Sequence, residues 1–193
     1  SLQTTAAAIL TGGRARRFGG RDKSRLIVDG RSIIVRQVET LQLVTREVFL
    51  VGHSPERFAD LKLPVFPDRV QGLGALGGIL TALESTRADH VLVIACDMPF
   101  LAEGLLRALV AHAADADAAW VHTQRGPEPL VACYRRTALA PIKAAVMAGD
   151  LKVADLGQRL RIHALSGRDL AAFGAAEQLL TNLNTPEDYA RVQ

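Results

Sequence analysis

A glycine-rich and strongly basic stretch, Leu10–Ser24 with the sequence LTGGRARRFGGRDKS, has the residue types that bind phosphate. It contains four glycines, and the twelve positions 14–25 carry six arginine or lysine residues against one acid. Glycines let backbone N–H groups approach an anion, and the cations neutralise phosphate charge. Because the stretch follows the apolar run AAAIL, it predicts a phosphate-binding loop at the end of a buried strand.

Four residues of this stretch are the candidates for contacting a phosphorylated ligand. We expect Gly12 and Gly13 to present backbone N–H groups, and Arg17 and Lys23 to neutralise the phosphates. A Walker P-loop does not fit, because that motif needs glycine immediately before its lysine and Asp22 stands there. A solvated basic turn, in which the glycines serve only the bend, is the alternative.

Later motifs supply carboxylates and amides. Asp97 ends the buried run HVLVIACD, where a carboxylate can hold a hard divalent cation that also contacts phosphate; capping of the next helix is the alternative. Asp68 is either a second carboxylate near the site or a turn residue. Asn182 and Asn184 lie two apart on a predicted strand, and so share a face on which paired amides can bind the edge of a heterocycle.

The segment GLGALG, Gly72–Gly77, satisfies the dinucleotide-binding pattern G-x-G-x-x-G, with Asp97 twenty residues beyond it. Five residues, 67–71, separate it from the preceding predicted strand, whereas the fingerprint begins at the strand end. We therefore predict a loop that leads into a helix and whose glycines allow close approach of a ligand or of the sheet. A nicotinamide or flavin oxidoreductase is the competing interpretation.

Alternating strands and helices position these motifs. The pattern predicts strands over 4–10, 47–52, 63–66 and 90–97, and helices over 32–44, 54–61, 75–85 and 101–113. Strands separated by helix-length segments imply parallel pairing with right-handed crossovers, hence a doubly wound α/β sheet. In such a sheet the carboxyl ends of the strands bind ligands, so the basic loop and Asp97 are expected at one edge.

In the second half of the chain, predicted strands and helices alternate less regularly. The runs AAWVHT and PLVACYRR flank QRGPEP and predict two antiparallel strands. Helices are expected over 137–149 and 151–160, and strands over 161–165 and 179–184. A last short helix starts at Thr185-Pro186-Glu187-Asp188, which combines a hydroxyl cap, proline and an acid three residues after the cap.

Size and composition favour one globular domain over residues 1–193. The chain is 49% hydrophobic and 22% charged, and it has no apolar stretch near the ~20 residues that span a bilayer. It also lacks the features of a secretory signal, so we expect a cytoplasmic protein with no membrane partner and with Cys96 and Cys133 as reduced, buried thiols. The basic loop has one aromatic residue, Phe18, which argues against a nucleic-acid partner.

Five motifs in order, LTGGRARRFGGRDK, GLGALGGI, ACDMPF, EPLVACY and LNTPED, resemble the molybdenum cofactor guanylyltransferases, the MobA family of the nucleotidyltransferase superfamily. The resemblance spans essentially the whole chain. The first motif is shared by many nucleotidyltransferases, and the ordered set is more specific. The resemblance implies a Rossmann-like nucleotidyltransferase fold and transfer of GMP from GTP to the phosphate of molybdopterin or the molybdenum cofactor, with Mg²⁺ required and pyrophosphate released.

The resemblance also implies roles for particular positions. It puts GTP mainly on the N-terminal half of the domain and the pterin acceptor mainly on the C-terminal half. Lys23, Asp97 and Arg17 would be catalytic, with Asp97 binding the metal. The GTP-binding positions would be Leu10, Thr11, Gly12, Gly13, Lys23, Asp68 and Asp97, and the pterin-binding positions Asn182 and Asn184. Proteins of cofactor biosynthesis and of molybdoenzyme maturation are further candidate partners.

Two segments depart from the family pattern. Thr11 replaces the alanine of the common LAGG, which adds a hydroxyl beside the base site, and RGPEPLVACY differs from some members at the pterin end. Related cytidylyltransferases typically show LAAG, so Gly12 and Gly13 favour the larger guanine. A cytidylyl- or sugar-phosphate-specific nucleotidyltransferase and a non-catalytic nucleotide or pterin carrier are the alternatives.

Overall fold

The computed structural model describes residues 4–12, 17–18, 21–69, 72–183 and 185–192, and in this part of the chain a seven-stranded sheet is the central element. The strand order is β11-β9-β10-β8-β1-β6-β7. The strands are β1 (Thr5–Leu10), β6 (Glu47–Val51), β7 (Val65–Phe66), β8 (His90–Ala95), β9 (Ala118–Thr123), β10 (Gly126–Arg135) and β11 (Ile162–Leu165). Only β10 runs antiparallel to its neighbours. The mostly parallel α/β sheet with an antiparallel part in the second half is therefore confirmed.

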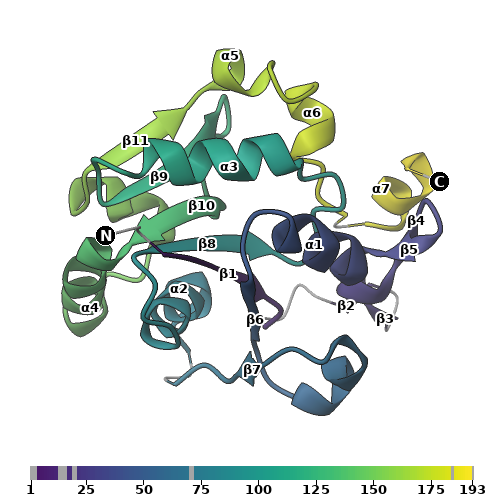
Figure 1. Cartoon of the computed structure of the whole chain (residues 1–193), viewed down its shortest axis with the longest axis horizontal. Helices are drawn as coiled ribbons and strands as arrows, with labels where there is room; N and C mark the ends of the chain where they lie inside the picture. Colours follow the sequence, from purple (N-terminus) through teal and green to yellow (C-terminus); the bar gives the residue numbers. More distant parts are fainter. Residues whose placement is uncertain (1–3, 13–16, 19–20, 70–71, 184, 193) are drawn as a thin grey trace.

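Helices cover both faces of this sheet (Figure 1). They are α1 (Ile33–Gln42), α2 (Gly74–Glu84), α3 (Glu103–His112), α4 (Leu139–Met147), α5 (Gly167–Leu170) and α6 (Ala176–Leu179), whereas α7 (Pro186–Arg191) lies beside the sheet. One buried cluster contains residues of α1 and α3, and a second contains residues of α2 and α4. The sheet thus lies between two helical layers, as the doubly wound pattern predicts.

Strand β1 shows how the sequence specifies this layering. Its residues Ala6–Leu10 are all buried, which is the continuous apolar run expected of a strand covered on both faces. Ala7 and Ile9 belong to the cluster with α1 and α3, whereas Ala8 and Leu10 belong to the cluster with α2 and α4. The alternation follows from the period of two in a strand.

Two glycines near the start of α2 allow close packing: Gly77, the last residue of GLGALG, and Gly78, which follows it. A Cβ atom on Gly78 would lie 2.8 Å from Leu10 Cδ1, so the helix can approach β1 only because that position has no side chain. A Cβ on Gly77 would similarly lie 2.9 Å from Leu73 Cβ. Gly78 therefore lets α2 pack closely against the sheet, and Gly77 leaves room for Leu73, the residue that precedes the helix.

Three predicted elements differ from the structure. Residues 55–61 and 153–158 form 3-10 helices, η3 (Pro55–Leu61) and η5 (Val153–Gln158), in place of α-helices. The predicted strand 179–184 is wrong over its described residues: α6 ends at Leu179, and the backbone N–H and hydroxyl of Thr181 donate to carbonyls of Gln178 and Glu177. These local hydrogen bonds continue the helical turn and compete with extended pairing.

Small elements gather on the side of the sheet away from the N-terminus (Figure 1). They are the hairpins β2 (Arg17–Phe18) with β3 (Arg21–Asp22) and β4 (Ile27–Val28) with β5 (Arg31–Ser32), the 3-10 helix η2 (Lys23–Arg25), and α7. Helix α7 starts with the expected capping box, in which Thr185 and Asp188 exchange hydrogen bonds of 3.0 and 3.1 Å. This start fixes the direction of the last helix.

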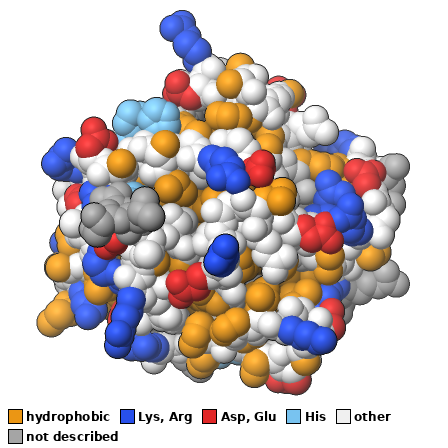
Figure 2. All heavy atoms as spheres, in the orientation of Figure 1, with side chains coloured by type: hydrophobic (Ala, Val, Ile, Leu, Met, Phe, Trp, Pro, Cys, Tyr) orange, Lys and Arg blue, Asp and Glu red, His pale blue; other side chains and the backbone are white. Residues whose placement is uncertain are grey.

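Charged side chains of both signs are mixed on the face shown in Figure 2, and Lys and Arg form no continuous basic stripe there. Among the described residues, no helix is both long enough and apolar enough to cross a membrane.

His90, at the start of β8, makes stability depend on pH. It is 2% exposed, and neither ring nitrogen has a hydrogen-bond partner within the described residues. Burial lowers the pKa of His90 below its ordinary value of 6.5, and the positive charge of Arg135 lowers it further. Below pH 6.5 the unfolded state therefore binds more protons than the folded state, so acidification reduces the free energy of unfolding.

We expect the wild-type protein to lose stability as the pH falls from 6.5 towards 5, and the His90→Leu variant to lose less over the same interval. Chemical denaturation at each pH measures the free energy of unfolding. Equal pH dependence in the two proteins would contradict this role of His90.

Candidate active site

The carboxyl ends of four parallel strands meet at one edge of the sheet. Leu10, the last residue of β1, pairs with Val51 of β6 and with Ala95 of β8, so these three strands end level with one another. The N–H of Gly52 donates to the carbonyl of Phe66, which brings the end of β7 to the same edge. The segments that follow these strands contain Thr11, Gly12, Asp68 and Asp97.

Thr11 begins the loop after β1 and is fixed by two hydrogen bonds. Its backbone N–H and its hydroxyl both donate to the carbonyl of Val51, at 2.9 and 3.1 Å. The side chain of Leu10 is buried against α2, so Leu10 can meet a ligand only through its backbone. Gly12 follows, half-buried, and Gly13 lies outside the described residues.

Gly52 keeps Thr11 in place, because a Cβ atom at position 52 would lie 2.1 Å from Thr11 Oγ1. We expect Gly52→Ala to displace Thr11 and to destabilise the protein by about 1–3 kcal/mol, the usual cost of overpacking. Urea unfolding measures the loss. Gly167→Ala is the control, since nothing lies within 4 Å of a Cβ there. Equal stability of the two variants would contradict this packing argument.

Lys23 is the first residue of η2 and is only 4% exposed, although lysine is rarely buried. Asp22 caps this helix: its Oδ1 accepts from the N–H and the hydroxyl of Ser24, at 3.0 and 2.7 Å. Oδ2 of Asp22 accepts from Arg57, at 2.5 Å. The acid that interrupts the basic stretch is therefore what holds the backbone of Lys23 in place.

The other cations of the stretch do not all remain available for a ligand. Arg25 donates to both carboxylate oxygens of Asp60, at 3.0 and 2.5 Å, and to the carbonyl of Arg57. Its role is therefore to attach η2 to η3. The backbone of Arg17 lies in β2, but its side chain is outside the described residues, as are Arg14 and Arg16. Among the cations of the stretch whose side chains are described, Lys23 is the one that we consider for phosphate binding, because it is buried close to the segment of Asp97.

Packing brings the segments of Lys23 and Asp97 to one region. Leu26, three residues after Lys23, packs in a small buried cluster with Leu183. The N–H of Leu183 donates to the carbonyl of Asp97, at 3.2 Å. Gln37 of α1 donates from Nε2 to the carbonyls of Ala95 and Met98, at 2.7 and 3.0 Å, and so fixes the chain on both sides of Asp97.

A second carboxylate, Glu128, lies beside Asp97. Val131 of β10 pairs with Ile94 of the antiparallel β8, and Glu128 lies three residues from Val131 in the direction of the end of β8. Burial raises the pKa of Glu128, and the negative charge of Asp97 raises it further, while Arg125 opposes both effects. A β-bulge between Glu128 and Ala132 gives β10 its local bend at this point, as bulges often do next to sites.

Asp68 and Asn182 complete the described part of the site. Asp68 is half-buried and lies two residues after β7, at the same edge as Thr11. Asn182 precedes the Leu183 residue that is hydrogen-bonded to Asp97, and its Oδ1 is buried without a hydrogen-bond partner in the described part of the chain. Asn184 lies outside the described residues. The sequence predicted that Asn182 and Asn184 share one face of a strand. Asn182 is not on a strand, because residues 180–183 do not form one.

The side-chain oxygen atoms of Asp97, Glu128 and Asn182 fit a divalent cation of the Mg²⁺ type. Among the described residues, no group of three or more His, Cys, Asp or Glu side chains could hold a metal. Mg²⁺ is usually held by one or two carboxylates together with substrate phosphates, and does not need a complete protein cage. Asp97, with Glu128 beside it and the buried Oδ1 of Asn182 on the adjacent segment, meets that requirement.

The chain is similar over most of its length to known proteins of one family. Residues 7–164 match the family model of the MobA-like NTP transferase domain. The chain is 31% identical to a probable molybdenum cofactor guanylyltransferase of Carboxydothermus hydrogenoformans over 191 residues, 99% of this chain and 96% of the relative. It is 34% identical over 192 residues to a protein of the same name from Pelotomaculum thermopropionicum, 100% of this chain and 93% of that relative.

A solved structure is also similar over nearly the whole chain. It is the crystal structure of molybdopterin-guanine dinucleotide biosynthesis protein A from Archaeoglobus fulgidus, with a TM-score of 0.80 and 26% identity over 97% of this chain and 96% of that one. The Rossmann-like fold inferred from the motifs is therefore found in a solved relative.

Proposed function

The chain belongs to the MobA-like NTP transferase family, and on that premise we propose that it transfers GMP from GTP to the phosphate of molybdopterin or of its molybdenum form. The observation that carries the proposal is its full-length similarity to guanylyltransferases, together with the position of Thr11, Gly12 and Asp97 after strands that end at one sheet edge. GTP would bind mainly to the N-terminal half of a single domain, and the acceptor mainly to the C-terminal half. We place the reaction in the cytoplasm, where GTP is supplied.

The reaction joins two anions, so charge neutralisation is the main task of the site. An oxygen of the acceptor phosphate attacks the α-phosphorus of GTP, the bond to the β-phosphate oxygen breaks, and pyrophosphate leaves. Such a transfer needs positioning and electrostatic stabilisation and no covalent enzyme intermediate. We propose that Lys23 and Arg17 bind the triphosphate, and that backbone N–H groups at Gly12 and Gly13 contact the nucleotide.

Asp97 would hold the Mg²⁺ ion, which neutralises phosphate charge when it is bound. Glu128 and Asn182 lie on the neighbouring segments and complete the oxygen-rich surroundings. We propose that Asp68 contributes to the GTP site from the end of β7, and that Asn182 and Asn184 contact the acceptor.

Guanine is the proposed base because the loop after β1 has little bulk. Gly12 lacks a Cβ, which leaves room for a purine. The hydroxyl of Thr11, the residue that departs from the family pattern, donates its hydrogen to Val51, so its donor is not directed to a base. A site that distinguishes bases by hydrogen bonding and shape can prefer one strongly over another.

The proposal is tested with three reactions under the same conditions. Two of them combine molybdopterin with GTP or with CTP, and the third combines a nucleotide with hexose 1-phosphate as the acceptor. With molybdopterin and Mg²⁺, we expect pyrophosphate release from GTP to exceed that from CTP by at least about 10-fold, a difference of ~1.4 kcal/mol in transition-state binding. Faster release with CTP would favour a cytidylyltransferase. Release that depends on hexose 1-phosphate would favour a sugar-phosphate nucleotidyltransferase.

A further inference from the structure

Two histidine side chains from separate elements meet on the surface of the protein. His112 is the last residue of α3, His163 lies in β11, and both are exposed. The centres of their rings are 4.4 Å apart, and the ring planes are tilted by 33°. We propose that this pair binds a divalent transition-metal ion of the Ni²⁺ or Cu²⁺ type. The inference goes beyond the proposed function, because no residue assigned above to GTP, Mg²⁺ or the acceptor belongs to the pair.

Buried contacts hold the backbones on which the two imidazoles stand. Leu109, Leu165 and Leu170 belong to one buried cluster, which packs α3, β11 and α5 together. The backbone of His163 pairs with that of Ala119 in β9, and β11 is the last strand at this edge of the sheet. Figure 2 shows histidine atoms exposed at the upper left, in the region where Figure 1 shows β11 and an end of α3.

The distance between the two rings suits one shared metal ion. With a metal–nitrogen bond of about 2.0–2.1 Å and a ring centre roughly 1.1 Å beyond the nitrogen, two imidazoles at a right angle have centres about 4.5 Å apart. At a tetrahedral angle the centres would be about 5.1 Å apart. The observed 4.4 Å therefore fits adjacent positions of a square-planar or octahedral ion, the geometry that Ni²⁺ and Cu²⁺ adopt with nitrogen and oxygen ligands.

The rings can turn their nitrogen atoms towards the ion without moving apart. The centre of an imidazole ring lies close to the axis of its Cβ–Cγ bond, so rotation about χ2 changes the direction of the nitrogens and leaves the ring centre nearly in place. The χ2 torsion of histidine is broad, and both side chains are exposed. Neutral imidazole is also the commonest protein ligand of transition metals.

Asp169 of α5 places a negative charge beside the pair. Its Oδ2 accepts hydrogen bonds from the N–H and the hydroxyl of Ser166, at 2.8 and 3.2 Å. These hydrogen bonds lower the pKa of Asp169, and the charges of His112 and His163 lower it further, so both rings lie within electrostatic range of its carboxylate. A carboxylate next to metal-binding imidazoles can accept the N–H of the second ring nitrogen and orient the ring.

The pair provides two ligands of a larger coordination shell. Within the described part of the chain, no group of three or more His, Cys, Asp or Glu side chains could hold a metal, so water completes the shell of this ion. The ion joins the end of α3 to the edge strand β11, two elements that otherwise meet through apolar packing. A ligand that binds only the folded state stabilises it, so the bound ion raises the unfolding temperature.

The test titrates the full chain with NiCl2 in a non-chelating buffer that contains excess MgCl2, which occupies the oxygen ligands around Asp97. Isothermal titration calorimetry measures Ni²⁺ affinity. His163→Phe keeps an aromatic ring beside His112 but removes its lone pair, and His112→Ala removes the other ligand. We expect each change to lower the affinity by at least about 10-fold, the smallest usual effect of removing even an outer partner of a metal ligand. His53→Gln, which removes an exposed histidine outside the pair, should bind Ni²⁺ as the wild type does.

Thermal unfolding gives an independent readout. At a free Ni²⁺ concentration about 100 times the dissociation constant, the unfolding midpoint of the wild type should rise by about 5–10 °C, and that of His163→Phe should not change. Absence of Ni²⁺ binding by the wild type would overturn the inference, as would wild-type affinity in either His112→Ala or His163→Phe, because the proposed ion needs both imidazoles. GTP takes no part in these measurements, so their outcome is independent of the proposed function.

Discussion

Asp97→Ala should lower metal-dependent GMP transfer by about 100-fold or more, which corresponds to several kcal/mol of transition-state stabilisation. Asp97 follows the end of β8, where the hydrogen bonds of Gln37 and Leu183 fix its backbone. Loss of its carboxylate removes the proposed ligand of the ion that neutralises phosphate charge. Initial rates of pyrophosphate release at saturating GTP, over a range of Mg²⁺ concentrations, measure the effect.

Two further variants make the Asp97 result specific. Asp97→Asn keeps the size of the side chain, so a large loss of rate in this variant identifies the charge as the cause. Glu56→Gln, an exposed acid in the first turn of η3, should retain the wild-type rate. A wild-type rate in Asp97→Ala would refute the metal assignment.

Lys23→Met should raise the KM for GTP and reduce kcat/KM by about 10- to 100-fold, the effect of removing hydrogen bonds to charged groups worth roughly 1.5–3 kcal/mol. Methionine retains the length and apolar stem of this 4%-exposed side chain, so the variant tests the ammonium group more than the packing. Steady-state kinetics with GTP varied at saturating acceptor give the two constants.

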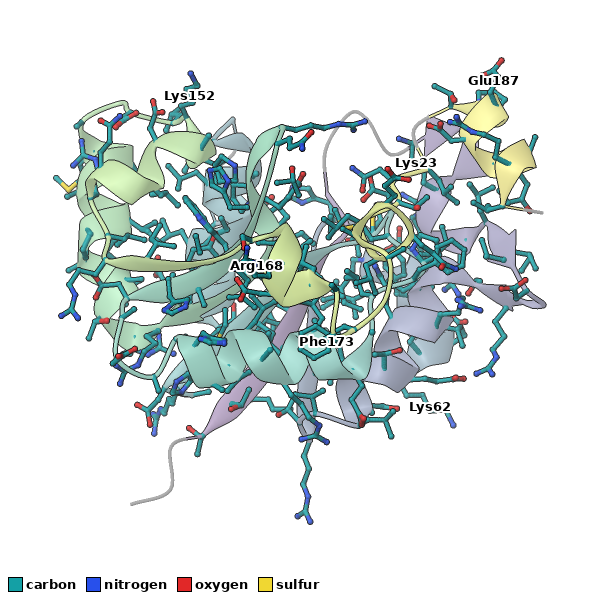
Figure 3. All side chains as sticks on the ribbon, turned by 90° about the horizontal axis from the view of Figure 1, so that it is seen from above. Lys23, Lys62, Lys152, Arg168, Phe173 and Glu187 are labelled. Atoms are coloured by element: carbon teal, nitrogen blue, oxygen red, sulfur yellow. The ribbon has the colours of Figure 1, made fainter. Side chains whose placement is uncertain are left out.

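The matched control for Lys23 is Lys152→Met. Lys152 is exposed, and Figure 3 shows it at the other end of the molecule from Lys23. This control should leave kcat/KM unchanged. Equal kcat/KM values in Lys23→Met and Lys152→Met would remove Lys23 from the triphosphate site.

The sheet could be predicted from the sequence because its central strands have an unambiguous pattern. The runs around Ala6–Leu10 and His90–Ala95 are apolar throughout and are separated by segments of helical period, which requires parallel strands covered on both faces. The secondary structure of the segment 179–184 could not be decided from its sequence. Its leucines, Leu179, Leu180 and Leu183, have spacings that suit a helical turn as well as a strand. Side-chain and backbone hydrogen bonds of Thr181 decide in favour of the turn.

The rule that ligands bind at the carboxyl ends of parallel strands predicted that the basic loop and Asp97 share one edge, and Thr11, at the start of that loop, does lie at the edge where β8 ends. The position of Asp68 at the same edge, after β7, was left open by the sequence. Glu128 was missed as a member of this group because its position depends on the pairing of β10 with β8 and on a bulge. The attachment of Arg25 to Asp60 was missed for a similar reason: the partners are 35 residues apart, and only the packing of η2 against η3 brings them together.

The central claim is that Lys23 and Asp97 hold one GTP triphosphate and its metal ion between them. A crystal structure of the protein with Mn²⁺ and a non-hydrolysable GTP analogue tests it most directly, because anomalous scattering locates the manganese ion. The account predicts an anomalous peak bonded to the Asp97 carboxylate and to a phosphate oxygen, with Lys23 Nζ contacting the same triphosphate. A triphosphate bound away from Lys23, or a manganese peak with no contact to Asp97, would contradict it.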